Sequence, residues 1–118
     1  MNFKNRVTAA LVVTFLAQTA LACDAPTEIS VPNGSKATEK EMTAAGQAYH
    51  QFMIGMQLYQ VCLENEANQD RLTADDDLSK AEIKAQENRF ASLHNSASAA
   101  MESTTESFEE AVSDYKAR

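Results

Sequence analysis

The fold is decided by residues 38–66, which read TEKEMTAAGQAYHQFMIGMQLYQVCLENE. Larger or apolar side chains recur there in alternating steps of three and four, at Met42, Ala45, Tyr49, Phe52, Met56, Tyr59 and Leu63. Such heptad spacing keeps one face of a helix apolar along its length. The stretch opens on Thr38 and Glu41, which form a capping box that satisfies backbone N–H groups of the first turn. We therefore predict an amphipathic helix over about residues 38–66.

A second helix is predicted over about residues 79–117. Ser79 and Glu82 form another capping box, and the chain continues without Pro or Gly to Arg118. The larger side chains of this segment are Ile83, Phe90, Leu93, Ala97, Met101, Thr104, Phe108, Val112 and Tyr115. Residues 95–105 are mostly small or hydroxylated, which leaves open whether the helix is continuous or breaks near Ser98–Ser103.

A polar connection, residues 67–78, separates the two predicted helices. Two amphipathic helices joined by a short turn make an antiparallel hairpin, so the predicted fold class is all-α and coiled-coil-like, over residues 38–118. The acidic run 75–77 lacks the alternating ligands and the glycine of a calcium loop. We interpret it as an acidic turn before the N-terminus of the second helix, where the helix dipole favours negative charge.

The two predicted helices differ in length. The second spans about 58 Å and the first about 44 Å, so one end of the second helix is expected to project. The side chains on that end are Phe108, Val112 and Tyr115. Exposed apolar groups there favour a partner. The alternatives are that the N-terminal arm covers them, or that the helix breaks and folds back.

The first 22 residues are predicted to be a signal peptide. Lys4 and Arg6 precede the uncharged run TAALVVTFLAQTALA, which is too short for a comfortable membrane span. The run closes on small residues around Leu21, so cleavage is predicted between Ala22 and Cys23. The protein is therefore expected to be periplasmic or secreted. A lipoprotein would also begin at Cys23, but its signal prefers Leu at position 20 and a small residue at 21, the reverse of this order.

The charge of the mature chain excludes two classes of partner. Without Lys4 and Arg6, 17 acidic residues stand against 8 basic ones, a formal net charge of −9. Basic residues are scattered rather than clustered, so neither nucleic acid nor an anionic membrane is expected to bind. After cleavage no membrane contact is predicted, unless Cys23 is lipidated.

The two cysteines, Cys23 and Cys62, are predicted to form a disulfide. An even pair in a small exported domain favours pairing. Residues 23–37, CDAPTEISVPNGSKA, contain both prolines and the turn signal Asn33-Gly34, so they are expected to form an extended arm. An extended arm of this length reaches about 50 Å, while about 36 Å of helix separate Thr38 from Cys62. The arm is therefore expected to fold back along the first helix, strapped to it by the disulfide.

Several of these residues resemble a group of small uncharacterised exported proteins of Gram-negative bacteria. The matching motifs are Cys23 with Pro26, Val31-Pro32-Asn33-Gly34, Ala37-Thr38, Glu41-Met42 and Tyr59-x-x-Cys62. In that group the turn commonly reads Ile-Pro-Asp-Gly, so Val31 and Asn33 depart from it conservatively. The match covers residues 23–63 and not the second helix. The resemblance implies export and paired cysteines, and it implies no activity.

No catalytic pattern is recognisable around His50, His94 or any other residue, so we predict a non-catalytic protein without cofactor or resident metal. The favoured function is an exported envelope protein that binds a protein partner or another copy of itself through its helical faces. The alternative is a small periplasmic protein that binds a soft, copper-type metal through His50 and Met53, with His94 as a further ligand candidate. A hairpin that turns near residue 72 would bring His94 level with His50.

Overall fold

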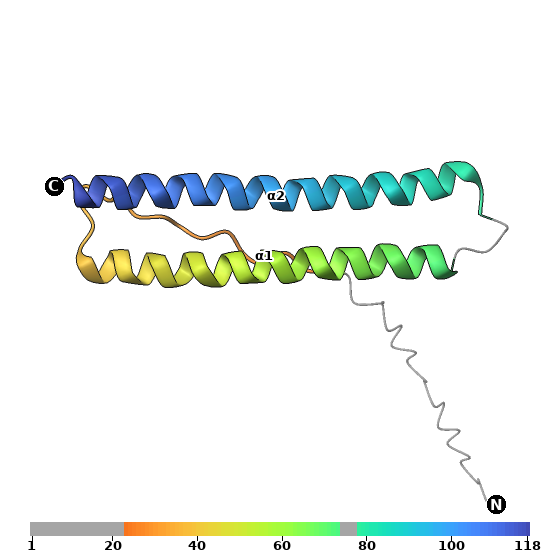
Figure 1. Cartoon of the computed structure of the whole chain (residues 1–118), viewed down its shortest axis with the longest axis horizontal. Coiled ribbons are helices and arrows are strands. Elements are labelled where there is room, and N and C mark those ends of the chain that lie inside the picture. The colour runs from red at the N-terminus through yellow and green to blue at the C-terminus, as the bar shows by residue number, and fades with distance from the viewer. Residues whose placement is uncertain (1–22, 74–77) are drawn as a thin grey trace, which may run out of the picture.

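The computed structural model describes residues 23–73 and 78–118, and the predicted signal peptide, including Ala22 at its cleavage site, lies outside them. Two helices, α1 (Glu39–Thr73) and α2 (Lys80–Lys116), lie side by side and run antiparallel (Figure 1). No strand occurs in the described part of the chain. The predicted all-α hairpin is confirmed.

Both helices begin at the predicted capping boxes. Thr38 Oγ1 accepts a hydrogen bond from Glu41 N at 3.1 Å, and Glu41 Oε2 accepts from Thr38 N at 3.2 Å. Ser79 and Glu82 form the same reciprocal pair, at 3.2 and 3.0 Å. Each box satisfies two backbone N–H groups that the helix itself leaves without a partner, which explains why the helices start there.

The first helix ends later than predicted. α1 continues to Thr73 instead of ending at residue 66. Residues 67–73 contain neither Gly nor Pro, so their polarity alone does not stop the helix. Arg71 supports the last turns by donating from Nη2 to Asn68 Oδ1 at 2.8 Å. The predicted connection is therefore shorter, and its acidic run 75–77 lies outside the described residues.

The second helix is continuous through Ser98–Ser103, which answers the question that the sequence leaves open. Four seam residues of α1 are buried as predicted: Ala45, Phe52, Met56 and Leu63. Phe52 and Met56 pack against the buried Ala97 of α2. Because Ala97 is small, the larger α1 side chains fit between the helices at the close packing typical of protein interiors.

The second helix does not project beyond the first, so the expectation for Phe108, Val112 and Tyr115 is wrong. α1 has 35 residues and α2 has 37, which makes them nearly equal in length. Phe108 stacks on Tyr49 with ring centroids 4.6 Å apart, and Val112 and Tyr115 are half-buried. The longer α1 is the physical reason, since its extra residues remove the difference in length.

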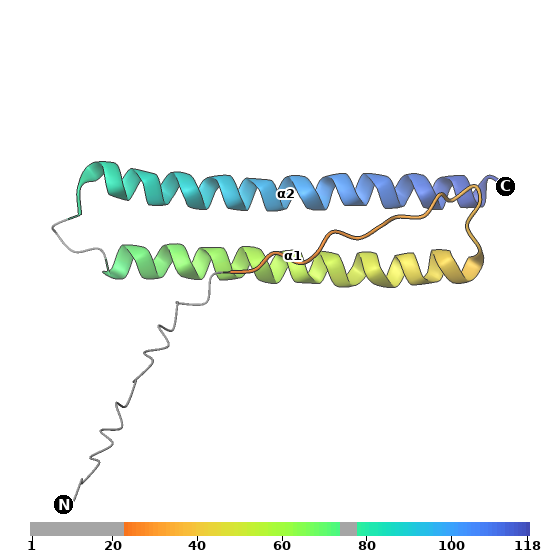
Figure 2. The same ribbon diagram turned by 180° about the vertical axis from the view of Figure 1, so that it is seen from behind.

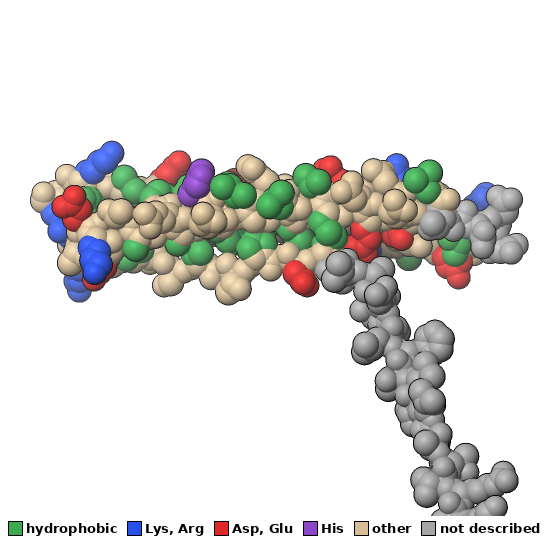
Figure 3. Space-filling model, turned by 90° about the horizontal axis from the view of Figure 1, so that it is seen from below, with side chains coloured by type: hydrophobic (Ala, Val, Ile, Leu, Met, Phe, Trp, Pro, Cys, Tyr) green, Lys and Arg blue, Asp and Glu red, His purple; other side chains and the backbone are tan. Residues whose placement is uncertain are grey.

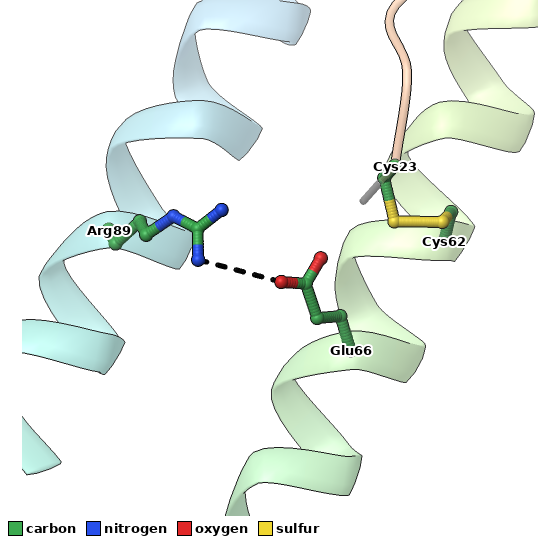
Figure 4. The surroundings of a disulfide bond; sticks show 4 residues. All are labelled: Cys23, Cys62, Glu66 and Arg89. Atoms are coloured by element: carbon green, nitrogen blue, oxygen red, sulfur yellow. Dashed lines mark ion pairs between the residues drawn. A yellow bond between two sulfur atoms is a disulfide. The ribbon is translucent and has the colours of Figure 1, made fainter. Parts of the chain in front are cut away.

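The extended arm lies along both helices and runs from the middle of α1 to the C-terminal end of α2 (Figure 2). The predicted disulfide is present: Cys23 and Cys62 have their Cα atoms 5.8 Å apart (Figure 4). Every third residue of the arm is half-buried, namely Cys23, Pro26, Ile29 and Pro32. Val31 is half-buried as well. This period of three is typical of a polyproline II chain, whose backbone needs no partner strand.

Two glycines allow the arm to lie close to the helices. A Cβ on Gly55 would lie 3.2 Å from the ring of Pro26, so this glycine makes room for the arm against α1. A Cβ on Gly34 would overlap the carbonyl oxygen of Ala111, because the turn of the arm lies directly against the α2 backbone. The missing side chains are therefore part of how the arm packs.

The turn after the arm is tied to the end of α2. Asn33 Oδ1 accepts from Ser35 N at 3.0 Å, and the Asn33 carbonyl accepts from Ala37 N at 2.9 Å. Arg118 donates from Nη1 to the carbonyl oxygens of Gly34 and Ala37. The start of α1 and the end of α2 are therefore held together through backbone carbonyl groups.

The half of the hairpin nearest the connection is not covered by the arm. Every residue from Ser79 to Arg89 is exposed. Arg89 Nη1 and Glu66 Oε1 form an ion pair at 3.5 Å between the helices (Figure 4). Because an exposed pair of this kind contributes about 0–1 kcal/mol, we infer that this half is the less stable end of the hairpin.

We expect Gly34→Ala to destabilise the protein by about 1–3 kcal/mol, because the added Cβ forces the turn away from Ala111. Gly46→Ala is the matched control, since its Cβ would meet only Phe108 Cζ at an ordinary 3.7 Å. The control is expected to stabilise α1 by up to about 1 kcal/mol through higher helix propensity. Urea unfolding followed by circular dichroism measures both changes. Equal effects of the two substitutions would contradict the close contact at Gly34.

Loss of the disulfide is expected to lower the free energy of unfolding by about 2–4 kcal/mol, because the denatured chain is no longer closed into a loop. The two cysteines are 39 positions apart, and breaking the bond also frees the Cys23 end of the arm. The urea midpoint of the wild type with and without reductant measures this effect. The double substitution of Cys23 and Cys62 by Ser is the control and should not respond to reductant. A wild-type midpoint that reductant leaves unchanged would disprove the role of the disulfide.

Candidate functional site

The outer face of α1 carries a second apolar stripe, opposite the seam. Ile54, Leu58 and Val61 are 41%, 65% and 50% exposed. Their spacing of four and three residues places them on one face of the helix. Phe52 and Met56 are buried on the opposite face. α1 is therefore apolar on two faces, of which one packs against α2 and the other is open. We call Ile54, Leu58 and Val61 the outer stripe.

The outer stripe lies within a long uncharged stretch. Residues 42–63 contain no Asp, Glu, Lys or Arg, although these residue types make up 23% of the chain. Figure 3 looks onto this side of the molecule, and apolar and uncharged polar side chains cover most of the middle of α1. Depletion of charge at the centre of a surface distinguishes protein interfaces better than overall hydrophobicity does. The outer stripe has the composition of an interface.

The second helix has the opposite character on its exposed side. Residues 102–114 contain five acids and no base. All five carboxylates are exposed: Glu102, Glu106, Glu109, Glu110 and Asp114. Negative charge is thus concentrated along one edge of the hairpin, and the charge-free stretch of α1 forms the other edge.

The heptad seam does not predict the outer stripe. It assigns a single apolar face to this helix, and Ile54, Leu58 and Val61 fall between the seam positions. Two signals in the sequence point to the stripe: its own helical spacing, and the lack of charge from residue 42 to residue 63. Neither signal distinguishes an open face from one covered by the arm. Only the arrangement of the arm and the two helices shows that this face is open.

The histidines do not meet, and the expectation that His94 lies level with His50 is wrong. Gln60 Nε2 donates to the carbonyl oxygen of His94 at 3.3 Å, and His94 Nε2 lies 3.5 Å from Glu64 Oε1. His94 is therefore level with residues 60–64 of α1. That position is about 15–20 Å along the helix axis from His50.

The longer first helix explains this displacement. Hydrogen bonds at 2.8 Å join Tyr49 Oη to Thr105 Oγ1 and Gln60 Nε2 to Ser98 Oγ. The midpoints of these pairs in the sequence lie between residues 77 and 79 rather than at residue 72. Because α1 continues to Thr73, the chain cannot turn at residue 72. Each residue of α2 therefore lies beside a residue of α1 that is closer to the C-terminal end of α1 than predicted.

The two remaining residues of the soft-metal hypothesis differ in their surroundings. His50 is exposed. Met53 is half-buried, packs against the Phe52 cluster and accepts a weak hydrogen bond from Thr105 Oγ1 at 4.0 Å. Across residues 23–73 and 78–118, no group of three or more His, Cys, Asp or Glu side chains is placed to hold a metal ion. These contacts give Met53 a packing role.

A polar groove of about 600 Å³ lies between the arm and α2. Three hydroxyl and three carboxylate side chains line it, namely Ser103, Thr104, Ser107, Glu28, Glu110 and Asp114. No His, Cys, Lys or Arg is among its lining residues. The hydroxyl groups therefore have no adjacent imidazole to activate them as nucleophiles.

No protein-family model, curated protein or solved structure matches the chain. The resemblance of residues 23–63 to small exported proteins therefore stays a prediction based on its motifs. Of the two helices in the described residues, neither is both long and apolar enough to cross a membrane. The outer stripe is the strongest candidate for a functional site.

Proposed function

We propose that this protein is a non-catalytic envelope protein, periplasmic or secreted, that acts by binding another protein or a further copy of itself through its helical faces. The observation that carries the proposal is the outer stripe, a row of three exposed aliphatic side chains on a charge-free stretch of α1. Association removes such surface from water and gains about 25 cal/mol per Å² of apolar area buried.

The packing behind the outer stripe supports this proposal. Phe52 and Met56 anchor the middle of α1 against α2, and the Cys23–Cys62 disulfide holds the arm to the same part of the helix. The outer stripe is therefore presented on a rigid element. A rigid surface loses less conformational entropy on binding than a mobile one does.

Export is supported by the leader sequence together with the disulfide. Structural disulfides persist in oxidising compartments and are rare in the cytosol. The predicted cleavage makes Cys23 the first residue of the mature chain, and this residue is bonded to Cys62. The new N-terminus would thus be fixed to α1 as soon as the disulfide forms.

A binding role fits the side chains better than catalysis or soft-metal binding does. The polar groove has no imidazole or thiol in its lining. The soft-metal alternative loses its third ligand candidate, because His94 lies beside Glu64 instead of His50. The packing of the half-buried Met53 against the core cluster further favours a packing role over metal binding.

Intact mass spectrometry of the protein purified from its native envelope tests export. The expected mass is that of residues 23–118 less two hydrogen atoms, and thiol alkylation without reductant should add nothing. The control is the same protein alkylated after reduction, which should gain two alkyl groups. A mass raised by acyl chains, with Cys62 open to alkylation, would contradict soluble export and the disulfide together.

Photo-crosslinking in the living envelope tests protein binding. A photoreactive amino acid in place of Leu58 is expected to give protein adducts, because this side chain is 65% exposed in the middle of the outer stripe. The matched control is the same probe in place of Glu106, which is exposed among the acids of α2. Adducts at position 106 with none at position 58 would contradict binding through the outer stripe.

A further inference from the structure

We infer that the outer stripe binds the outer stripe of a second copy of this chain, in an antiparallel α1–α1 contact around a twofold axis between Gln57 and Leu58. This inference rests on the proposed function and names its partner. It is carried by three features: the spacing of the stripe, the distribution of charge over the two helices, and the area that the charge-free stretch offers.

The spacing of the outer stripe is self-complementary. A twofold contact uses the same patch on both subunits, so residues on either side of the axis face each other in exchanged order. With the axis between Gln57 and Leu58, Ile54 of one copy lies opposite Val61 of the other. The two Leu58 side chains then lie next to each other, offset by about 1.5 Å along the helices. Each aliphatic side chain of the stripe therefore meets an aliphatic side chain.

The distribution of charge favours a second copy on this face. Two mature chains of formal net charge −9 repel each other wherever their acidic surfaces meet. With the axis between Gln57 and Leu58, residues 52–63 of one copy face residues 52–63 of the other over about 18 Å of helix. None of these residues is Asp, Glu, Lys or Arg, so the two copies bring no like charges together there. The acidic residues 102–114 of α2 then lie on the outside of both copies.

The distance between the acidic edges weakens their repulsion further. Two α1 helices, each about 10 Å across, stand between the acidic faces of the two copies. The acidic faces are therefore at least about 20 Å apart, which exceeds the screening length of about 8 Å at physiological salt. A strongly charged partner, by contrast, would find no opposite charge on the outer stripe.

The area of the contact indicates a weak dimer. A face about 18 Å long and about 10 Å wide gives roughly 400 Å² in total over the two copies. Stable protein–protein interfaces usually bury at least about 1,200 Å². The dimer is therefore expected to dissociate on dilution, and its mass must be measured over a wide range of concentration.

Sedimentation equilibrium of the mature, disulfide-bonded chain tests the inference. The mass is expected to rise from one chain toward two as the protein is concentrated to the millimolar range. Leu58→Glu places two carboxylates against each other at the axis and should weaken association at least about tenfold. Ile83→Glu is the matched control, because Ile83 is an aliphatic residue that is 38% exposed on α2, away from the α1–α1 contact. The control should dimerise like the wild type.

Two results would overturn the second copy as partner: a wild type that stays monomeric at every concentration, or equal association of the Leu58→Glu and Ile83→Glu variants. Circular dichroism of both variants should show that the helices persist, since both Leu58 and Ile83 are exposed. If the wild type is monomeric while a probe at Leu58 crosslinks to an unlike protein, the second copy is excluded and the proposed function stands. If the probe gives no adduct either, both fall.

Discussion

The arm that lies along the two helices is the constraint on which the rest of the structure depends. No backbone hydrogen bond ties residues 24–32 to another described part of the chain, so the arm is held at its ends. At one end the disulfide joins Cys23 to Cys62, and at the other Gly34 lies against the α2 backbone, where Arg118 binds the turn. Between these anchors Ile29 packs against the core cluster. Two helices alone share a single seam, and the arm adds a third segment to that small core.

The features that the sequence predicts correctly depend on few residues at a time. A capping box needs two residues three positions apart, and the seam of α1 follows from the period of one helix. The disulfide follows because the chain has only two cysteines and an arm long enough to join them. The end of α1 has no such signal, since an exposed polar helix and a polar loop have similar compositions. That single error at Thr73 displaces His94 from His50 and removes the projecting end of α2.

The outer stripe shows why a surface is harder to predict than a core. A heptad pattern identifies the face that packs, and Ile54, Leu58 and Val61 lie outside that pattern. Whether they are covered depends on which side of α1 the arm follows, and this is decided by Gly55 facing Pro26 and by Cys62 facing Cys23. Both contacts lie on one flank of the helix, so the arm leaves the outer stripe open. The exposure of this face of the helix therefore follows from the path of a segment that is not helical.

The separation of charge between the two helices would also limit how far the proposed association could extend. A twofold contact between outer stripes uses the same surface on both copies, so it closes with two chains and leaves no stripe for a third. The surfaces that stay outside are the acidic edges of α2, which repel one another and keep closed pairs apart in solution. A contact between two different patches would instead continue into a filament. In the proposed dimer the middle of α1, which has no Asp, Glu, Lys or Arg, and the acidic edge of α2 are thus complementary: the first would provide the attraction, and the second would stop association at a pair.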